Sequence, residues 1–173
     1  MTKVVTAVAI LQLRDAGKFA LDDRVSSLLD EWHDGAARPA TVFDLLTHSA
    51  GLSYGFKNGD VAKQYRERGL ELPHRITPHG DRDNSRFPTS SSLKEFCATL
   101  SRLPRALEPG REFSYSASFD VLGRIVEATS GTDLESYFRE HIFEPLGMRD
   151  TSFVLSNDKQ DRLAAFTPAR RRA

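Results

Sequence analysis

The sequence of 173 residues predicts a mainly α-helical protein. Apolar residues recur three and four positions apart in several segments, which is the spacing that places them on one face of a helix. Ser, Thr or Asp stands before three of these segments and Gly follows others, as is typical of helix starts and ends. Alternating apolar and polar residues, the pattern of a half-buried strand, are nearly absent, and a short strand is predicted only over 151–155.

The first predicted helix covers residues 3–16 and ends before Gly17. Its first turns are apolar nearly all the way round, and its polar residues come mostly near its end. A helix with this pattern is expected to lie buried at the centre of a protein. Gly17 is suited to the left-handed conformation that commonly ends a helix.

Three later segments begin with residues that cap helices. Thr41, Ser91 or Ser92, and Asp133 each precede apolar residues at helical spacing, and their side chains can accept a hydrogen bond from a free N–H of the first turn. After the first helix, the predicted helices cover residues 21–29, 42–48, 60–68, 92–103, 119–130 and 133–141.

Two segments are predicted to lack regular structure within the one domain formed by residues 1–173. Residues 72–90 contain three prolines, a glycine and few apolar residues, so they are expected to form a long surface loop. Residues 168–173 show no pattern and are expected to be a disordered tail. No internal repeat divides the chain.

Composition excludes several classes of protein. Lys and Arg number 24 and so do Asp and Glu, whereas a nucleic-acid binder depends on uncompensated positive charge. Cys97 is the one cysteine, and it cannot form an internal disulfide framework or a zinc ribbon. The histidines lack the spacing of a zinc site. No metal, cofactor or nucleic-acid partner is therefore expected.

The apolar stretch from Val4 to Leu11 is too short to cross a bilayer, so no membrane span is expected. It follows Lys3, as in a signal peptide, but charged residues come directly after it and no small-residue cleavage site precedes them. It is therefore interpreted as a folded helix. The compartment is left open, with the cytoplasm slightly favoured, because any signal peptide would precede Met1.

Four segments carry motifs in a fixed order. They are Met1-Thr2-Lys3 with its apolar helix, Thr41 to Leu52, Glu108 to Gly123, and Tyr137 to Thr151. Together they resemble the β-lactamase-related serine hydrolases, a family of class C β-lactamases, D-alanyl-D-alanine carboxypeptidases and esterases. The resemblance implies that the chain is the helical region of an α+β serine β-lactamase/transpeptidase-like fold, with most of the antiparallel sheet missing.

The resemblance also implies two catalytic residues. The family's Ser-x-x-Lys motif opens a helix, which places a nucleophilic hydroxyl and an amine on one face. Burial is expected to lower the pKa of that amine, so that it accepts the serine proton, while a tyrosine across the cleft relays the proton. Lys3 matches the lysine and Tyr115 matches the tyrosine. We therefore expect Lys3 and Tyr115 to share a cavity.

The chain departs from the family pattern at three places. The serine would stand one position before Met1, and the Lys-Thr-Gly-type motif would follow residue 173, so the chain is expected to be truncated at both ends. Ala117 stands where many members have Asn, which favours an esterase-like enzyme over a dedicated β-lactamase.

Other residues that spell or suggest a site are interpreted as structural. Ser91-Ser92-Leu93-Lys94 and Ser156-Asn157-Asp158-Lys159 repeat the Ser-x-x-Lys spacing, but Ser91 or Ser92 is interpreted as a helix cap and Ser156 as part of a polar turn. His48, the histidine of the Leu-Thr-His run, is likewise expected to be a hydrogen-bonded structural residue rather than a metal ligand or a base.

These observations favour a fragment of an enzyme that hydrolyses an ester or a β-lactam or amide bond through an acyl-serine, with little activity by itself. The alternative is a non-catalytic helical pseudoenzyme or binding fragment. Either form would expose apolar surface where the sheet belongs, and would self-associate or bind a complementing chain. A metal hydrolase is disfavoured by the histidine spacing.

Overall fold

The computed structural model describes residues 2–55, 57–70 and 92–162, and in this part of the chain helices are joined by loops. The loop predicted over 72–90 and the tail predicted over 168–173 lie outside the described residues. The helices are α1 (Thr2–Asp15), α2 (Val25–Leu28), α3 (Val42–Leu46), α4 (Asp60–Glu67), α5 (Leu93–Ser101), α6 (Ser118–Ser130), α7 (Leu134–Phe138), the π-helix η2 (Arg139–Phe143) and the 3₁₀-helix η3 (Asn157–Arg162).

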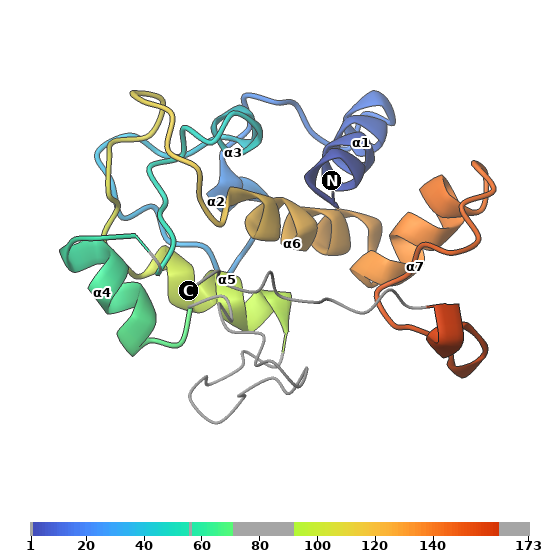
Figure 1. Ribbon diagram of the computed structural model, residues 1–173. Coiled ribbons are helices and arrows are strands. Elements are labelled where there is room, and N and C mark those ends of the chain that lie inside the picture. The colour runs from blue at the N-terminus through green and yellow to red at the C-terminus, as the bar shows by residue number, and fades with distance from the viewer. Residues whose placement is uncertain (1, 56, 71–91, 163–173) are drawn as a thin grey trace, which may run out of the picture.

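Helix α6 is the centre of the fold. Figure 1 shows it crossing the middle of the molecule, with α1 and α3 on one side, α5 on the other and α7 beyond its C-terminal end. Its inner face carries Val121, Leu122, Ile125 and Val126, all fully buried. Packing against these residues from several directions fixes the positions of the surrounding helices.

Helix α1 is less buried than its sequence suggests. Ala9, Ile10 and Leu13 face the core, but Val4 is 68% exposed and Val8 is 40% exposed. The prediction of a central, buried helix was therefore wrong for one face. The apolar pattern could not distinguish a helix enclosed on all sides from one that carries an exposed apolar face.

The predicted caps are confirmed. The hydroxyl of Thr41 accepts a bond from the backbone N–H of Asp44 at 3.2 Å, and the Asp44 carboxylate accepts one from the N–H of Thr41 at 3.0 Å, which completes a capping box. Ser92 caps α5 by accepting the N–H of Glu95, and Asp133 caps α7 by accepting that of Ser136. These ends were predictable because a cap depends only on residues three or four positions apart.

Several boundaries differ from the prediction. Helix α2 covers only Val25–Leu28 of the helix predicted over 21–29, and the helix predicted over 133–141 divides into α7 and η2. Residues 151–155 do not form the predicted strand. Within the described ranges the only bridge between extended segments joins Arg24 to Thr41. A strand needs a neighbouring strand for its backbone hydrogen bonds, and residues 151–155 have none in this part of the chain.

Two loops run side by side and lead into the site. The N–H of Ser114 donates to the carbonyl of His48 at 2.8 Å, and the N–H of Gly110 donates to that of Ser49 at 2.8 Å. These bonds tie the loop after α3 to the loop before α6. The pairing brings the segment around residue 54 and the segment around residue 115 to the start of α1.

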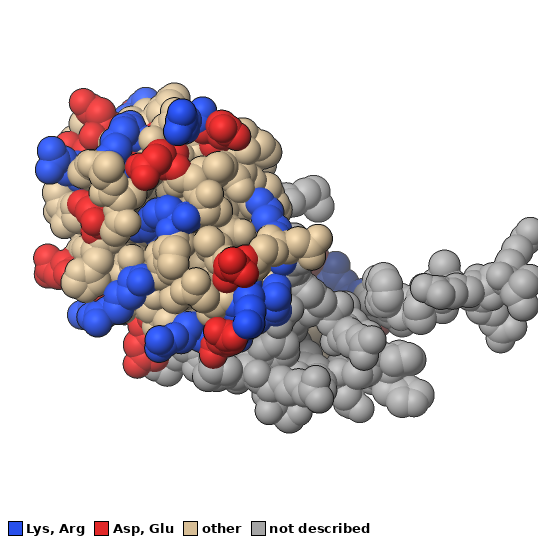
Figure 2. Space-filling model, turned by 90° about the vertical axis from the view of Figure 1, so that its left-hand side faces the viewer, with Lys and Arg blue, Asp and Glu red and all other residues tan. Residues whose placement is uncertain are grey.

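The surface carries charges of both signs. Figure 2 shows Lys and Arg side chains interspersed with Asp and Glu over the face that lies at the left of Figure 1. Among the described helices, none has both the length and the apolar character needed to cross a membrane.

Candidate active site

Lys3 lies in the first turn of α1, and its half-buried side chain reaches the two paired loops. Its amine donates a hydrogen bond to the hydroxyl of Tyr54 at 3.4 Å. The same nitrogen lies 5.0 Å from the ring centre of Tyr115 and 5.3 Å from that of Phe119. These are distances at which an ammonium is attracted to the face of an aromatic ring.

Tyr115 is positioned by the loop before α6. Its ring centre lies 4.8 Å from that of His48 and 5.6 Å from that of Tyr54, while 45% of the residue remains exposed. The ring is thus held by its neighbours on one side and open on the other. The structure brings Lys3 and Tyr115, the two residues singled out in the sequence, into one cluster.

The ring of His48 packs against Tyr115 in this cluster. Its ring nitrogen Nδ1 accepts a hydrogen bond from the backbone N–H of Ser116 at 3.3 Å, which leaves the proton of a neutral ring on Nε2. Burial, and then the positive charges of Lys3 and Lys57, lower the pKa of His48. The hydrogen bond expected for this histidine is present, and its structural rather than catalytic role stays a prediction. The structure adds that this ring packs directly against Tyr115.

The charge on Lys3 differs from the expectation. Burial is the largest influence on the pKa of Lys3 and lowers it, but the phenols of Tyr54 and Tyr115 together raise that pKa above its ordinary value. The prediction that burial makes this amine a neutral base was therefore wrong for the arrangement seen here. Because the lysine side chain stays half-exposed, its loss of hydration lowers the pKa less than the two phenol oxygens raise it.

The pKa of Tyr54 is also raised, but for different reasons. Burial, followed by the negative charge of Asp120, raises the pKa of Tyr54, whereas Lys3 lowers it. The net direction is upward. Tyr54 therefore stays a neutral phenol over a wider pH range than a tyrosine in water.

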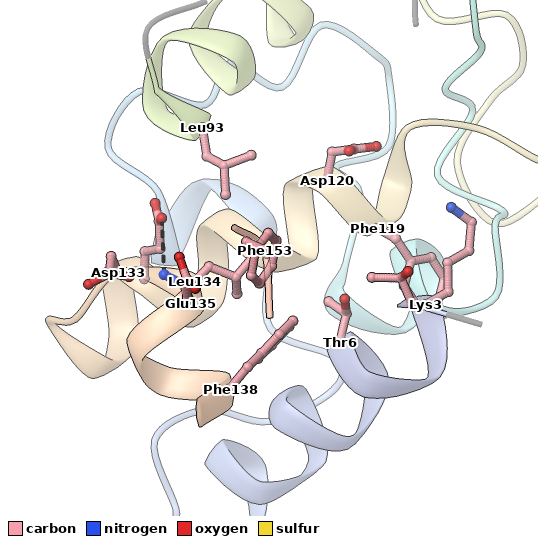
Figure 3. A pocket seen from close by; sticks show the side chains of 13 residues that line it. Lys3, Thr6, Leu93, Phe119, Asp120, Asp133, Leu134, Glu135, Phe138 and Phe153 are labelled. Atoms are coloured by element: carbon pink, nitrogen blue, oxygen red, sulfur yellow. Dashed lines mark hydrogen bonds between the residues drawn. The ribbon is translucent and has the colours of Figure 1, made fainter. Parts of the chain in front are cut away.

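A cavity of about 450 Å³ opens beside Lys3, between α1, α6 and α7. Its walls are largely aromatic and aliphatic, with Phe119 near Lys3 and Phe138 farther along (Figure 3). The carboxylate of Asp120 also lines it. Charged side chains lie at both ends, Lys3 and Asp120 at one and Glu135 at the other. Tyr115 is not among the lining residues, so this is not the cavity that Lys3 and Tyr115 were expected to share. A cavity with apolar walls and a few polar groups is typical of a small-molecule site.

Three residues of this site were not predicted from the sequence. Tyr54 lies two positions after the Leu-Thr-His-x-x-Gly-Leu run, and Phe119 and Asp120 lie inside the segment 108–123, but no spacing rule marks any of them. Tyr54 bonds to Lys3, and Asp120 lines the same cavity as Lys3, only because the fold brings together segments far apart in sequence. Sequence spacing alone carries no signal for such contacts.

Two serines stand three positions before a lysine, as in the Ser-x-x-Lys spacing. Ser91, before Lys94, lies outside the described residues, and Ser156, before Lys159, is an exposed residue ahead of η3. Ser92, next to Ser91, accepts the N–H of Glu95 at 3.2 Å and so caps α5. In the described part of the chain no three His, Cys, Asp or Glu residues are grouped so that they could hold a metal ion.

Comparison with known proteins places this geometry in context. Residues 1–172 match the model of the Beta-lactamase family. Protein Rv1367c of Mycobacterium tuberculosis is 33% identical over 96% of this chain and 41% of its own length. Lovastatin esterase of Penicillium rubens is 29% identical over 97% of this chain and 42% of its own length. Esterase EstB of Burkholderia gladioli is 32% identical over 89% of this chain and 37% of its own. The chain thus spans less than half the length of these curated relatives.

Solved structures show the same similarity. EstCE1, described as a hydrolase with promiscuous acyltransferase activity, superposes with a TM-score of 0.73 at 28% identity over 91% of this chain and 39% of its own. A penicillin-binding protein from Bacillus halodurans superposes with a TM-score of 0.63 at 28% identity over 94% of this chain and 44% of its own.

Proposed function

The chain belongs to the Beta-lactamase family, and from this membership we propose that it is the helical part of a serine hydrolase that cleaves carboxylic esters through an acyl-enzyme. One observation supports the proposal above the others. The amine of Lys3 lies 5.0 Å from the ring centre of Tyr115 and within hydrogen-bonding distance of the Tyr54 hydroxyl. An ammonium beside phenols is an arrangement that can move protons to and from a nearby hydroxyl.

The nucleophile in this proposal is a serine at the position before Met1, where the family's Ser-x-x-Lys motif places it. The serine oxygen attacks the ester carbon, and its proton passes to the oxygen of ionised Tyr115. The amine of Lys3 lies 5.0 Å from the centre of the Tyr115 ring, on the same side of the site. The ester C–O bond then breaks and the alcohol leaves with the proton. Water hydrolyses the acyl-serine by the same steps, and the serine regains its proton.

The proposed substrate class is an ester rather than a β-lactam. Ala117 occupies the position of an asparagine in many family members, and it is 3% exposed, so no side-chain amide is offered to substrate there. Relatives named as esterases and acyltransferases point the same way. Lys3 and Tyr115 remain the residues to which we assign the proton transfer.

Hydrolysis of p-nitrophenyl butyrate by the complete protein tests the proposal. In a protein that carries the serine, we expect Lys3→Met and Tyr115→Phe each to lower kcat/KM at least about 100-fold, because each removes a group from the proton path. Lys63→Met on the exposed face of α4 and Tyr137→Phe are matched controls that should retain activity. Undiminished activity in Lys3→Met would refute the assignment.

Residues 1–173 by themselves are expected to show little or no hydrolysis, since the proposed nucleophile lies before them. The same assay on this chain checks that expectation. Activity that Lys3→Met abolishes would place the nucleophile inside the chain, contrary to the proposal.

A non-catalytic binding role is the second candidate, and a specific observation favours it. Val4 and Val8 project from α1 as exposed apolar side chains. An exposed apolar face is typical of a surface that binds another polypeptide. Under this alternative the chain would bind a partner without hydrolysing ester in any form, including the form that carries the serine.

A further inference from the structure

Asp120 is a half-buried carboxylate of this site to which the proposed proton transfer gives no role. It lies in the first turn of α6 and lines the same cavity as Lys3 and Phe119. In Figure 3, Lys3 extends from α1 and Asp120 from α6, with Phe119 between them. Among the described residues no side chain forms a hydrogen bond or an ion pair with the Asp120 carboxylate.

The nearby arginine does not neutralise Asp120. Arg124 follows one turn later on α6, where it could form an intrahelical ion pair. Its guanidinium instead donates to Glu31 at 2.7 Å and lies 3.5 Å from Glu127. Lys3 is therefore the cation available to Asp120 in this part of the structure.

We propose that Asp120 is a positioning residue whose carboxylate keeps the amine of Lys3 protonated and directed at the phenols of Tyr54 and Tyr115. The influence of Asp120 on the charge of Lys3 is inferred only from their place in one cavity. Its consequence for catalysis rests on the proposed function. A negative charge at this place favours the ammonium form of Lys3 and disfavours ionisation of Tyr54. It thus keeps Tyr54 a neutral phenol beside the ammonium of Lys3.

The electrostatics of Asp120 and of Tyr54 agree with this geometry. Burial raises the pKa of Asp120, and the positive charge of Lys3 is the main opposing influence. The charge of Asp120 in turn raises the pKa of Tyr54. The other titratable or charged groups around Lys3 and its cavity are His48, Tyr54, Lys57, Tyr115, Glu127, Asp133 and Glu135.

The titration of Lys3 tests the proposal without any measurement of activity. The chain is labelled with ¹³C-lysine, and the Lys3 resonance is assigned by its loss in Lys3→Met. In Asp120→Asn we expect the midpoint of the Lys3 titration to move to lower pH. Asp120→Glu, which keeps the charge, should restore it at least in part.

Glu135→Gln is the matched control, because Glu135 lines the same cavity and the change removes the same charge. Figure 3 places Glu135 at the opposite end of the cavity from Lys3. The control should move the Lys3 midpoint less than Asp120→Asn does. Equal movement in both variants, or none in Asp120→Asn, would overturn the proposal.

The reciprocal measurement applies even if Asp120→Asn does not fold. Because two interacting groups shift each other's titration, Lys3→Met should move the midpoint of the Asp120 carboxyl to higher pH, as followed by ¹³C-aspartate labelling. An unchanged midpoint would contradict the proposal. If Lys3 depends on Asp120 but ester hydrolysis by the complete protein is insensitive to Lys3→Met, the proposed function fails and this inference stands.

Discussion

At the scale of single residues, Gly17 and Gly51 share one backbone conformation but differ in their surroundings. Their φ angles are +70° and +71°, in the left-handed region that disfavours a side chain. A Cβ on Gly17 would meet no atom within 4 Å, whereas one on Gly51 would lie 1.9 Å from the carbonyl oxygen of Leu107. Gly51 therefore permits the close approach of the two loops that carry Tyr54 and Tyr115.

Gly51→Ala should destabilise the fold far more than Gly17→Ala does. We expect a loss of about 1 kcal/mol at Gly17 from the backbone alone. At Gly51 we expect about 3 kcal/mol or more, because the two loops must also separate. Urea unfolding of both variants measures the difference. Equal losses would show that the contact with Leu107 does not constrain the loops.

The pKa of Lys3 depends on its neighbours in the fold and not on the motif that contains it. Its pKa is raised in the folded chain, so the stability it contributes is fully present below the ordinary pKa of a lysine, and is lost as pH rises through the raised value. The motif specified an amine at this position. The phenols that raise the pKa of this amine come from two other loops.

At the scale of elements, a largely buried ion pair joins the segment after α2 to α6. The guanidinium of Arg124 donates to the carboxylate of Glu31 at 2.7 Å, and the two side chains are only 16% and 9% exposed. Burial is the largest influence on the pKa of Glu31 and raises it, but the hydrogen bond and charge of Arg124 bring it below its ordinary value.

Glu31→Gln should lower stability in a manner that depends on pH. Because the pKa of Glu31 is lowered by folding, the pair stabilises above the ordinary carboxyl pKa, and the benefit is lost as pH falls through the lowered value. We expect a loss of about 1–2 kcal/mol at pH 7 that disappears in acid. Urea unfolding from pH 7 to pH 2 provides the measurement.

Glu140→Gln is a matched control for this pair. The Arg139–Glu140 pair is about half exposed, so its removal should change stability little at any pH. If Glu31→Gln and Glu140→Gln gave the same pH profile, the buried pair would have no special role in joining α2 to α6.

At the scale of the whole molecule, the exposed face of α1 is the feature that distinguishes this chain from a protein with a closed core. Val4, Val8 and Leu11 lie three and four residues apart on that face, and they are 68%, 40% and 37% exposed. Apolar side chains in contact with water favour association, because association removes their surface from solvent.

We expect the chain to self-associate through this face at micromolar concentration, and Val4→Gln with Val8→Gln to shift it toward the monomer. Sedimentation velocity over a concentration series measures the change. Val154→Gln, which alters an exposed valine away from α1, is the control and should leave association unchanged. A monomer at all concentrations would contradict the expectation.

The helices and their ends were largely predictable, because they depend on residues close in sequence. Thr41, Ser92 and Asp133 cap helices where the sequence placed caps. The strand over 151–155 was not predictable in this way, since pairing requires a distant partner. The cluster of Lys3 with Tyr115 was anticipated from motif order alone. The place of Asp120 was not, because it lines the same cavity as Lys3 only when α6 packs on α1.

The sequence by itself determined which segments become helices, where they are capped, and which family the chain resembles. These properties rest on spacing within about one helical turn and on the order of motifs. Only the tertiary structure decided that α1 exposes a face, that Tyr54 binds the Lys3 amine, and that the neighbouring phenols raise the pKa of that amine. Exposure and charge depend on what packs nearby, and those neighbours come from distant parts of the chain.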